Sequence, residues 1–249
     1  MTRLSTIAEF NDPRLVAVYD TINPYEPGTQ PDLYRSLAHE VGASTVLELG
    51  CGTGQVACAF AADGFRVTGV EPSAAMLSVA RARCVGVEWV HGGAAALGTL
   101  NADFAYMSGH VAQFFVTDEE WEDALSALRR ALRPGGWLSF EARDPRAREW
   151  ERWARSVRTS VVDPVAGPIE WWTEVHDVRG GVVSYAIHYR FLARDETLVS
   201  EAALRFRTEE ELRASLGEAG FAVECMYGNW DRAPIGNGAP ELIVLAHAQ

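Results

Sequence analysis

The stretch VLELGCGTG, residues 46–54, constrains the fold more than any other feature of this 249-residue sequence. Its first residues suit a buried strand, and three glycines spaced two apart follow at Gly50, Gly52 and Gly54. Glycine costs backbone entropy on folding, so such a run indicates a sharp turn that must stay free of side chains. Where a helix follows, the turn presents backbone N–H groups and a helix N-terminus to a ligand. The stretch therefore predicts a strand–turn–helix unit that binds a small molecule.

Strands and helices alternate along the chain on both sides of this turn. The predicted strands are residues 45–50, 65–71, 87–92, 102–109, 136–143, 221–228 and 241–247, and the predicted helices are 31–41, 54–64, 73–84, 117–136, 145–157 and 208–220. Strands that alternate with helices predict a parallel sheet covered on both faces. We expect an α/β fold with a doubly wound sheet of seven strands, mostly parallel with one antiparallel strand.

The domain organisation predicted from the sequence is one domain, residues 1–249, with two additions. Residues 1–42 form an N-terminal helical lid. Residues 169–207 contain three runs rich in Val, Tyr, Trp and Phe, separated by Gly180–Gly181 and by the polar segment ARDET. Such runs predict an antiparallel meander of three strands, inserted into the α/β domain.

Composition disfavours several classes of partner. The net charge of −12 would repel a phosphate backbone, so we expect no nucleic-acid partner. No apolar run reaches the ~18 residues of a membrane span, and the first residues lack the apolar core of a signal peptide. The four cysteines, Cys51, Cys58, Cys84 and Cys225, include no C-x-x-C pair. We expect free thiols, no bound metal and a cytoplasmic protein; the oligomeric state is not indicated.

An acidic residue at the end of the second predicted strand indicates which kind of ligand binds. Glu71 ends the second strand 17 residues after Gly54, where it can accept both hydroxyls of a ribose. The dinucleotide motif G-x-G-x-x-G would need a glycine at Gln55, whereas this chain has G-x-G-x-G. With VTGVEPS and LRPGGWLSFE further along, the chain resembles the class I S-adenosylmethionine-dependent methyltransferases, in their small-molecule branch. The resemblance covers roughly residues 40–145, together with the order of the elements that follow.

The resemblance implies a Rossmann-like fold, S-adenosylmethionine as the cofactor and an insert that roofs the substrate pocket. It implies cofactor contacts by Tyr19, Glu48, Gly50, Cys51, Gly52, Glu71, Pro72, Met76, Gly93, Ala94, Ser108, Gly109 and His110. Gly93 stands where family members often carry an acid that accepts from the adenine amino group, so backbone atoms or another residue would take that role. For Cys51 we expect a small apolar filler, because no base lies beside it in the sequence.

Methyl transfer requires aligned reactants, exclusion of water and, for some acceptors, a base. His110 is the candidate base, the alternative being a histidine that only hydrogen-bonds a loop. The candidate substrate residues are Tyr25, Gln113, Arg143, His176, His188 and Tyr189. The predicted function is transfer of the methyl group to a small organic molecule by direct in-line displacement, with oxygen slightly favoured over nitrogen. The alternatives are a methyltransferase-like cofactor-binding protein without transfer, such as a cyclase or a binding module, and a nicotinamide-dependent oxidoreductase, against which Gln55 in place of a glycine argues.

Overall fold

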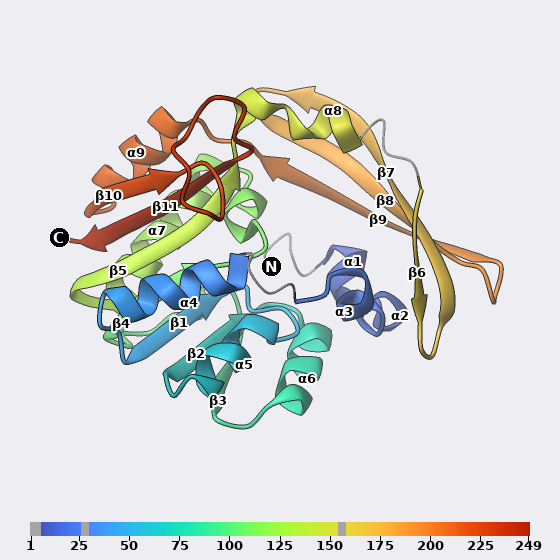
Figure 1. The fold of residues 1–249 in the computed structure, drawn as a ribbon, viewed down its shortest axis with the longest axis horizontal. Coiled ribbons are helices and arrows are strands. Elements are labelled where there is room, and N and C mark those ends of the chain that lie inside the picture. Colours follow the sequence, from blue (N-terminus) through green and yellow to red (C-terminus); the bar gives the residue numbers. More distant parts are fainter. Residues whose placement is uncertain (1–5, 26–29, 154–157) are drawn as a thin grey trace.

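Seven strands form the central sheet of the structure, a computed structural model that describes residues 6–25, 30–153 and 158–249 (Figure 1). These strands are β1 Thr45–Leu49, β2 Arg66–Glu71, β3 Val87–His91, β4 Ala102–Met107, β5 Leu132–Arg143, β10 Phe221–Tyr227 and β11 Glu241–Ala248. Their order is β10-β11-β5-β4-β1-β2-β3, and β11 runs antiparallel to both of its neighbours while the other pairs are parallel. The predicted fold class is confirmed. Strand β5 begins four residues earlier than predicted, because the preceding helix ends at Ala131.

Helices cover both faces of this sheet. Helices α4 (Gln30–Glu40) and α5 (Gln55–Ala62) pack with one hydrophobic cluster, and α7 (Asp118–Ala131) and α9 (Glu209–Glu218) pack with a second cluster. Helices α7 and α9 both start with a capping box, in which an N-cap threonine and a glutamate three residues later satisfy each other's backbone N–H groups. Among the described residues, no helix combines the length and the apolar character required to cross a membrane.

A second, antiparallel sheet lies beside the first and has four strands where the sequence predicted three (Figure 1). Its strands are β6 Thr159–Asp163, β7 Gly167–Arg179, β8 Val182–Phe191 and β9 Glu196–Arg205. The additional strand β6 is short and mostly exposed, so it lacks the alternation of apolar and polar residues that reveals a half-buried strand.

Short helices pack against the antiparallel sheet. They are α1 Ala8–Asn11, α2 Pro13–Val16, α3 Tyr19–Ile22 and α8 Glu149–Trp153. Leu15 and Val18 pack against Ile169, Tyr189 and Phe191 of the sheet. Helix α8 is shorter than the helix predicted at 145–157, since a 3₁₀ turn, η4 (Pro145–Ala147), precedes it and residues 154–157 lie outside the described part.

The expectation of four free thiols is wrong for two of them. Cys58 of α5 and Cys84, which caps the C-terminus of α6 (Ala74–Arg83), form a disulfide with their Cα atoms 6.0 Å apart. The pair is 26 residues apart in the sequence and meets because α5 and α6 lie side by side. Cys51 and Cys225 are free.

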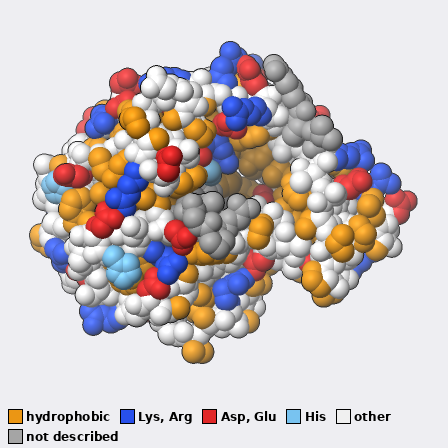
Figure 2. Space-filling model, viewed as in Figure 1, with side chains coloured by type: hydrophobic (Ala, Val, Ile, Leu, Met, Phe, Trp, Pro, Cys, Tyr) orange, Lys and Arg blue, Asp and Glu red, His pale blue; other side chains and the backbone are white. Residues whose placement is uncertain are grey.

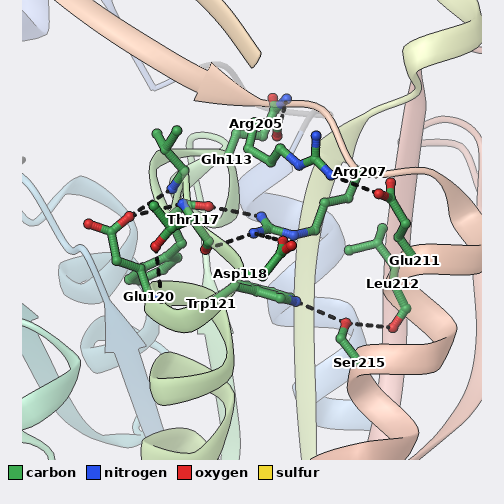
Figure 3. A network of polar contacts seen from close by, with 12 residues as sticks. Gln113, Thr117, Asp118, Glu120, Trp121, Arg205, Arg207, Glu211, Leu212 and Ser215 are labelled. Atoms are coloured by element: carbon green, nitrogen blue, oxygen red, sulfur yellow. Dashed lines mark hydrogen bonds and ion pairs between the residues drawn. The ribbon is translucent and has the colours of Figure 1, made fainter. Parts of the chain in front are cut away.

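A buried arginine joins the two sheets where β9 leads into α9 (Figure 3). Arg207 is 4% exposed and donates to the carbonyl oxygens of Phe115 (2.9 Å) and Thr117 (3.1 Å). Its guanidinium also lies 3.4 Å from a carboxylate oxygen of Asp118 and 5.1 Å from the centre of the Trp121 ring. Arg207 therefore fixes the antiparallel sheet to the N-terminus of α7.

Replacing Arg207 with methionine is expected to lower the free energy of unfolding by about 2–4 kcal/mol. The change removes the donor to the Phe115 carbonyl and one of the two donors to the Thr117 carbonyl, which also accepts from the Trp121 N–H, while it keeps most of the apolar stem. Urea denaturation measures the difference. Arg213→Met is the matched control, because Arg213 pairs with Glu209 on the exposed face of α9, and this substitution should cost within about 0.5 kcal/mol. Equal stability of the two variants would contradict the assignment.

Candidate cofactor and substrate site

A cavity of about 580 Å³ lies at the carboxyl ends of the parallel strands, between the central sheet and the short helices α1 and α3. In a doubly wound sheet, ligands bind at this edge. The residues predicted for the site that line it are Tyr19, Tyr25, Glu48, Gly50, Cys51, Gly52, Glu71, Met76, Ser108, Gly109, His110 and Arg143. Phe10, Ile22, Val111 and Phe114 add apolar walls. Figure 2 shows the surface hollowed between the two parts of the molecule, with hydrophobic side chains inside.

The glycine turn forms one wall of the cavity and is bare where the cavity opens. Gly52 has a φ of +53°, and a Cβ added there would meet no atom within 4 Å. At Gly54, which starts α5 with a φ of +78°, an added Cβ would lie 2.6 Å from the Trp89 ring. Packing against Trp89 therefore requires a glycine at position 54. The open space next to Gly52 is available to a ligand, and a side chain at this position would fill it.

Glu71 holds this turn in place. Its carboxylate accepts from the backbone N–H of Gly52 at 2.9 Å and from that of Ser73 at 2.8 Å, and the residue is 6% exposed. Burial raises the pKa of Glu71, and the two backbone hydrogen bonds oppose that effect. Its contact with a ribose stays a prediction; what the geometry adds is a role in fixing the turn at the cavity wall.

Glu48 provides the second acid of the cavity. It is 1% exposed, and its Oε1 accepts from the Ser108 hydroxyl at 2.7 Å. Its other oxygen, Oε2, is buried without a hydrogen-bond partner in the described part of the chain. Burial raises the pKa of Glu48 to about 7. An unpaired buried acceptor on the wall of a cavity suits a cationic ligand, and S-adenosylmethionine carries both a sulfonium and an ammonium group.

The affinity for S-adenosylmethionine is expected to rise with pH through pH 7. A cation binds the ionised form of Glu48 more tightly, and this form is lost as the pH falls below its pKa of about 7. The dissociation constant should increase up to about tenfold for each pH unit below 7. Calorimetry between pH 5.5 and 8.5 measures this dependence. Glu48→Gln should bind more weakly and show a flat profile, and a flat profile in the unchanged protein would remove Glu48 from the site.

Helix α3 is fastened to the glycine turn by a residue that the sequence analysis did not select. Asp20 accepts from the Thr53 hydroxyl at 2.6 Å and from the Gln55 amide at 2.9 Å, and it pairs with Arg83 of α6. Tyr19, the neighbour of Asp20, lines the cavity, and burial raises the pKa of its hydroxyl. Helix α3 therefore lies against the glycine turn.

His110 follows β4 in a left-handed conformation, with a φ of +59°, just before the 3₁₀ turn η3 (Val111–Phe114). Few residues other than glycine adopt this conformation, and it is enriched at functional sites. The ring Nε2 lies 3.0 and 3.1 Å from the two carboxylate oxygens of Glu241. The backbone N–H donates to Glu141 of β5, which also accepts from the hydroxyl of Tyr34. His110 is thus held on both sides by carboxyl groups.

The His110–Glu241 pair is neutral at pH 7. Burial, together with the nearby Arg143 guanidinium, lowers the pKa of His110 to about 3. Burial raises the pKa of Glu241 to about 8, although Arg143 opposes that shift. One proton therefore lies between the two side chains, and Glu241 holds it below about pH 8. Above that pH the pair carries one negative charge and can accept a proton.

Several predicted site residues lie away from the cavity. Pro72, Gly93 and Ala94 are not among the described residues that line it; Gly93 is the N-cap of the 3₁₀ turn η2 (Ala94–Ala96), which follows β3. Gln113 is buried; its amide oxygen accepts from Arg143 and its amide nitrogen donates to the Arg205 carbonyl, so it connects the two sheets (Figure 3).

The histidines of the insert also lie elsewhere, as the pleat of the strands explains. His188 and Tyr189 are consecutive on β8 and so point to opposite faces of the sheet. Tyr189 packs inward against α2, whereas His188 stacks on Trp172 and contacts Glu174. His188 pairs with Trp172 across the strands and not with His176. His176 is an exposed strand residue.

Glu241 is a site residue that was not predicted, although its position at the start of the last strand could have indicated it. Glu241 is the first residue of β11, which is antiparallel to β5. The start of an antiparallel strand lies at the same edge as the carboxyl ends of the parallel strands, so an acid there belongs beside the end of β5. The register pairs Glu241 with Arg143.

A doubly wound sheet with a bare glycine turn after β1 and an acid at the end of β2 defines a nucleoside-cofactor protein of the methyltransferase type. A family model described as "Methyltransferase domain" matches residues 46–136. A trans-aconitate 2-methyltransferase of Paracidovorax citrulli is 31% identical over 192 residues, which are 66% of this chain and 66% of that protein's length. The cypemycin N-terminal methyltransferase of a Streptomyces species is 27% identical over 96% of this chain and 97% of its own.

Solved structures agree on the fold. An S-adenosylmethionine-dependent methyltransferase of Clostridium acetobutylicum superposes with a TM-score of 0.76 at 14% identity, over 94% of this chain and 98% of that one. The CcbJ methyltransferase of Streptomyces caelestis gives 0.74 at 22% identity, over 93% and 96%. The chain belongs to the class I S-adenosylmethionine-dependent methyltransferases, and S-adenosylmethionine is the cofactor of this family.

Proposed function

We propose that this protein transfers a methyl group from S-adenosylmethionine to a small organic molecule. The observation that carries the proposal is one cavity lined by two sets of residues. One set is the bare turn at Gly52 with the acids Glu48 and Glu71, and the other is His110 and Arg143. The first set suits the cofactor, and the second is available to an acceptor beside it.

S-adenosylmethionine supplies a methyl group on a sulfonium, which a nucleophile displaces in line. The residues of this chain hold the reactants and exclude water. Phe10 of α1 and Phe114 of η3 pack edge to face, with ring centres 5.6 Å apart, and form an apolar wall of the cavity. We assign binding of the acceptor to this side, beneath the lid (residues 1–42) and the antiparallel sheet.

An oxygen acceptor is favoured over a nitrogen acceptor because of the His110–Glu241 pair. A hydroxyl is a weak nucleophile until it loses its proton, and the pair provides a proton acceptor on the cavity wall. The 31% identical relative is named for trans-aconitate, which supports an acceptor of similar small size.

The test is incubation of the protein with methyl-labelled S-adenosylmethionine and a fractionated extract of low-molecular-mass metabolites. We expect label in an organic product together with S-adenosylhomocysteine in equal amount. A protein that binds S-adenosylmethionine without producing S-adenosylhomocysteine with any fraction would be a cofactor-binding module, and the proposed function would be wrong.

A further inference from the structure

Arg143 stands at the end of β5 on the cavity wall and has few partners for its donors. One terminal nitrogen donates to the amide oxygen of Gln113 at 2.9 Å, and the guanidinium lies 5.0 Å from the centre of the Trp153 ring. Within the described residues, no carboxylate oxygen lies within 4.0 Å of it. An arginine side chain offers five N–H donors, so most of those of Arg143 are left for a ligand or water.

The acids near Arg143 either hold protons more strongly than usual or have another partner. Burial raises the pKa of Glu241 to about 8 and also raises the pKa of Glu141. Glu149 of α8 pairs with Arg152 at 2.8 Å. Burial lowers the pKa of Arg143, but a guanidinium stays charged in proteins. Arg143 therefore presents a positive charge to the cavity with no carboxylate of the described residues at ion-pair distance.

A second donor lies on the opposite sheet. Tyr185 of β8 is 7% exposed, and its ring centre lies 5.6 Å from that of Trp153, the same indole that Arg143 contacts. Its hydroxyl makes no hydrogen bond to the residues that the structure describes. Burial, with Glu9 nearby, raises the pKa of Tyr185, so the hydroxyl keeps its proton and remains a donor.

We propose that Arg143 and Tyr185 form a subsite for a carboxylate group of the acceptor molecule. A guanidinium binds a carboxylate through two parallel hydrogen bonds, and the phenol adds a third donor. A carboxylate is favoured over a phosphate because one positive charge balances one negative charge. This inference rests on the proposed function, since it names the chemical class of the acceptor.

The experiment uses the full chain saturated with S-adenosylhomocysteine and a panel of matched small molecules. Each carboxylic acid is paired with its primary amide, as 4-hydroxybenzoate with 4-hydroxybenzamide, and 4-hydroxyphenyl phosphate and tyramine are included. Calorimetry is expected to show acids that bind about tenfold to a hundredfold more tightly than their amides. Arg143→Met should abolish this preference while the affinity for S-adenosylhomocysteine stays within about twofold, and Tyr185→Phe should reduce it by a smaller factor.

Arg146→Met is the matched control, because Arg146 is close in sequence but pairs with Asp144. Its preference for acids should equal that of the unchanged protein. The inference is overturned if no acid binds better than its amide, if the phosphate or tyramine binds best, or if the preference survives Arg143→Met. Label transfer to acceptors without a carboxylate would refute the subsite and keep the proposed function. Selective binding of acids without label transfer to any of them would support the subsite and refute the proposed function.

Discussion

Gly52→Val is expected to abolish binding of S-adenosylmethionine, with affinity falling by at least about a hundredfold, while the sheet remains folded. The valine side chain would enter the open space above the turn, where no atom lies within 4 Å of the added Cβ. The branched side chain would also be strained at a φ of +53°, at a cost of about 1–2 kcal/mol. Calorimetry measures the affinity, and circular dichroism checks the fold.

Gly42→Val separates the filling of the cavity by a side chain from the backbone strain at a positive φ. Gly42 has a φ of +69°, its added Cβ would also meet nothing within 4 Å, and it lies in the turn before β1, away from the cavity. This variant should lose a similar amount of stability and bind the cofactor normally. If both variants bind equally well, the turn does not hold the cofactor.

His110→Ala is expected to lower the rate of methyl transfer at neutral pH by about 10²–10⁴-fold, with a much smaller loss of cofactor affinity. The variant removes the ring that lies 3.0 Å from Glu241 on the cavity wall. Part of the rate should return at high pH, where the hydroxyl of the acceptor ionises without help. Equal losses of rate and cofactor affinity would make His110 a cofactor contact, and no loss of either would make it structural.

The pH dependence of the same reaction follows from Glu241. Below about pH 8 Glu241 is mostly protonated and only the minor ionised fraction of the pair accepts a proton from the acceptor, so kcat/KM should rise as the pH rises through 8. Glutamine resembles the protonated acid, and Glu241→Gln should therefore be slow and lack this inflection.

The pKa of Glu241 also affects stability, because it is higher in the folded protein than in the unfolded chain. The folded protein therefore binds the proton more tightly, and the free energy of unfolding falls as the pH rises from 4.5 towards 8. Glu241→Gln should be more stable than the unchanged protein at pH 9 but not at pH 4.

The sequence predicts those site residues that lie close to one another along the chain. The turn at Gly50–Gly54 and the acid Glu71 lie within one strand–helix–strand unit, so their spacing alone indicates a nucleoside cofactor. The disulfide between Cys58 and Cys84 depends on two helices packing side by side, which no spacing rule revealed.

The acceptor side of the cavity is assembled from distant segments. His110, Arg143 and Glu241 follow from the strand order β11-β5-β4, in which the last strand inserts beside β5. His188 lies away from the cavity because the register of β8 decides which face a side chain takes, and a shift by a single residue reverses it. Sequence patterns indicate where strands lie, but the order and register in which the strands pair decide which side chains become neighbours.

A crystal structure with S-adenosylhomocysteine would show where this protein binds its cofactor. We expect density in the cavity along the turn at Gly52, with the amino-acid part near Glu48 and Ser108, the ribose near Glu71 and the sulfur directed toward His110. Density at another place, or a sulfur directed away from His110 and Arg143, would contradict this expectation.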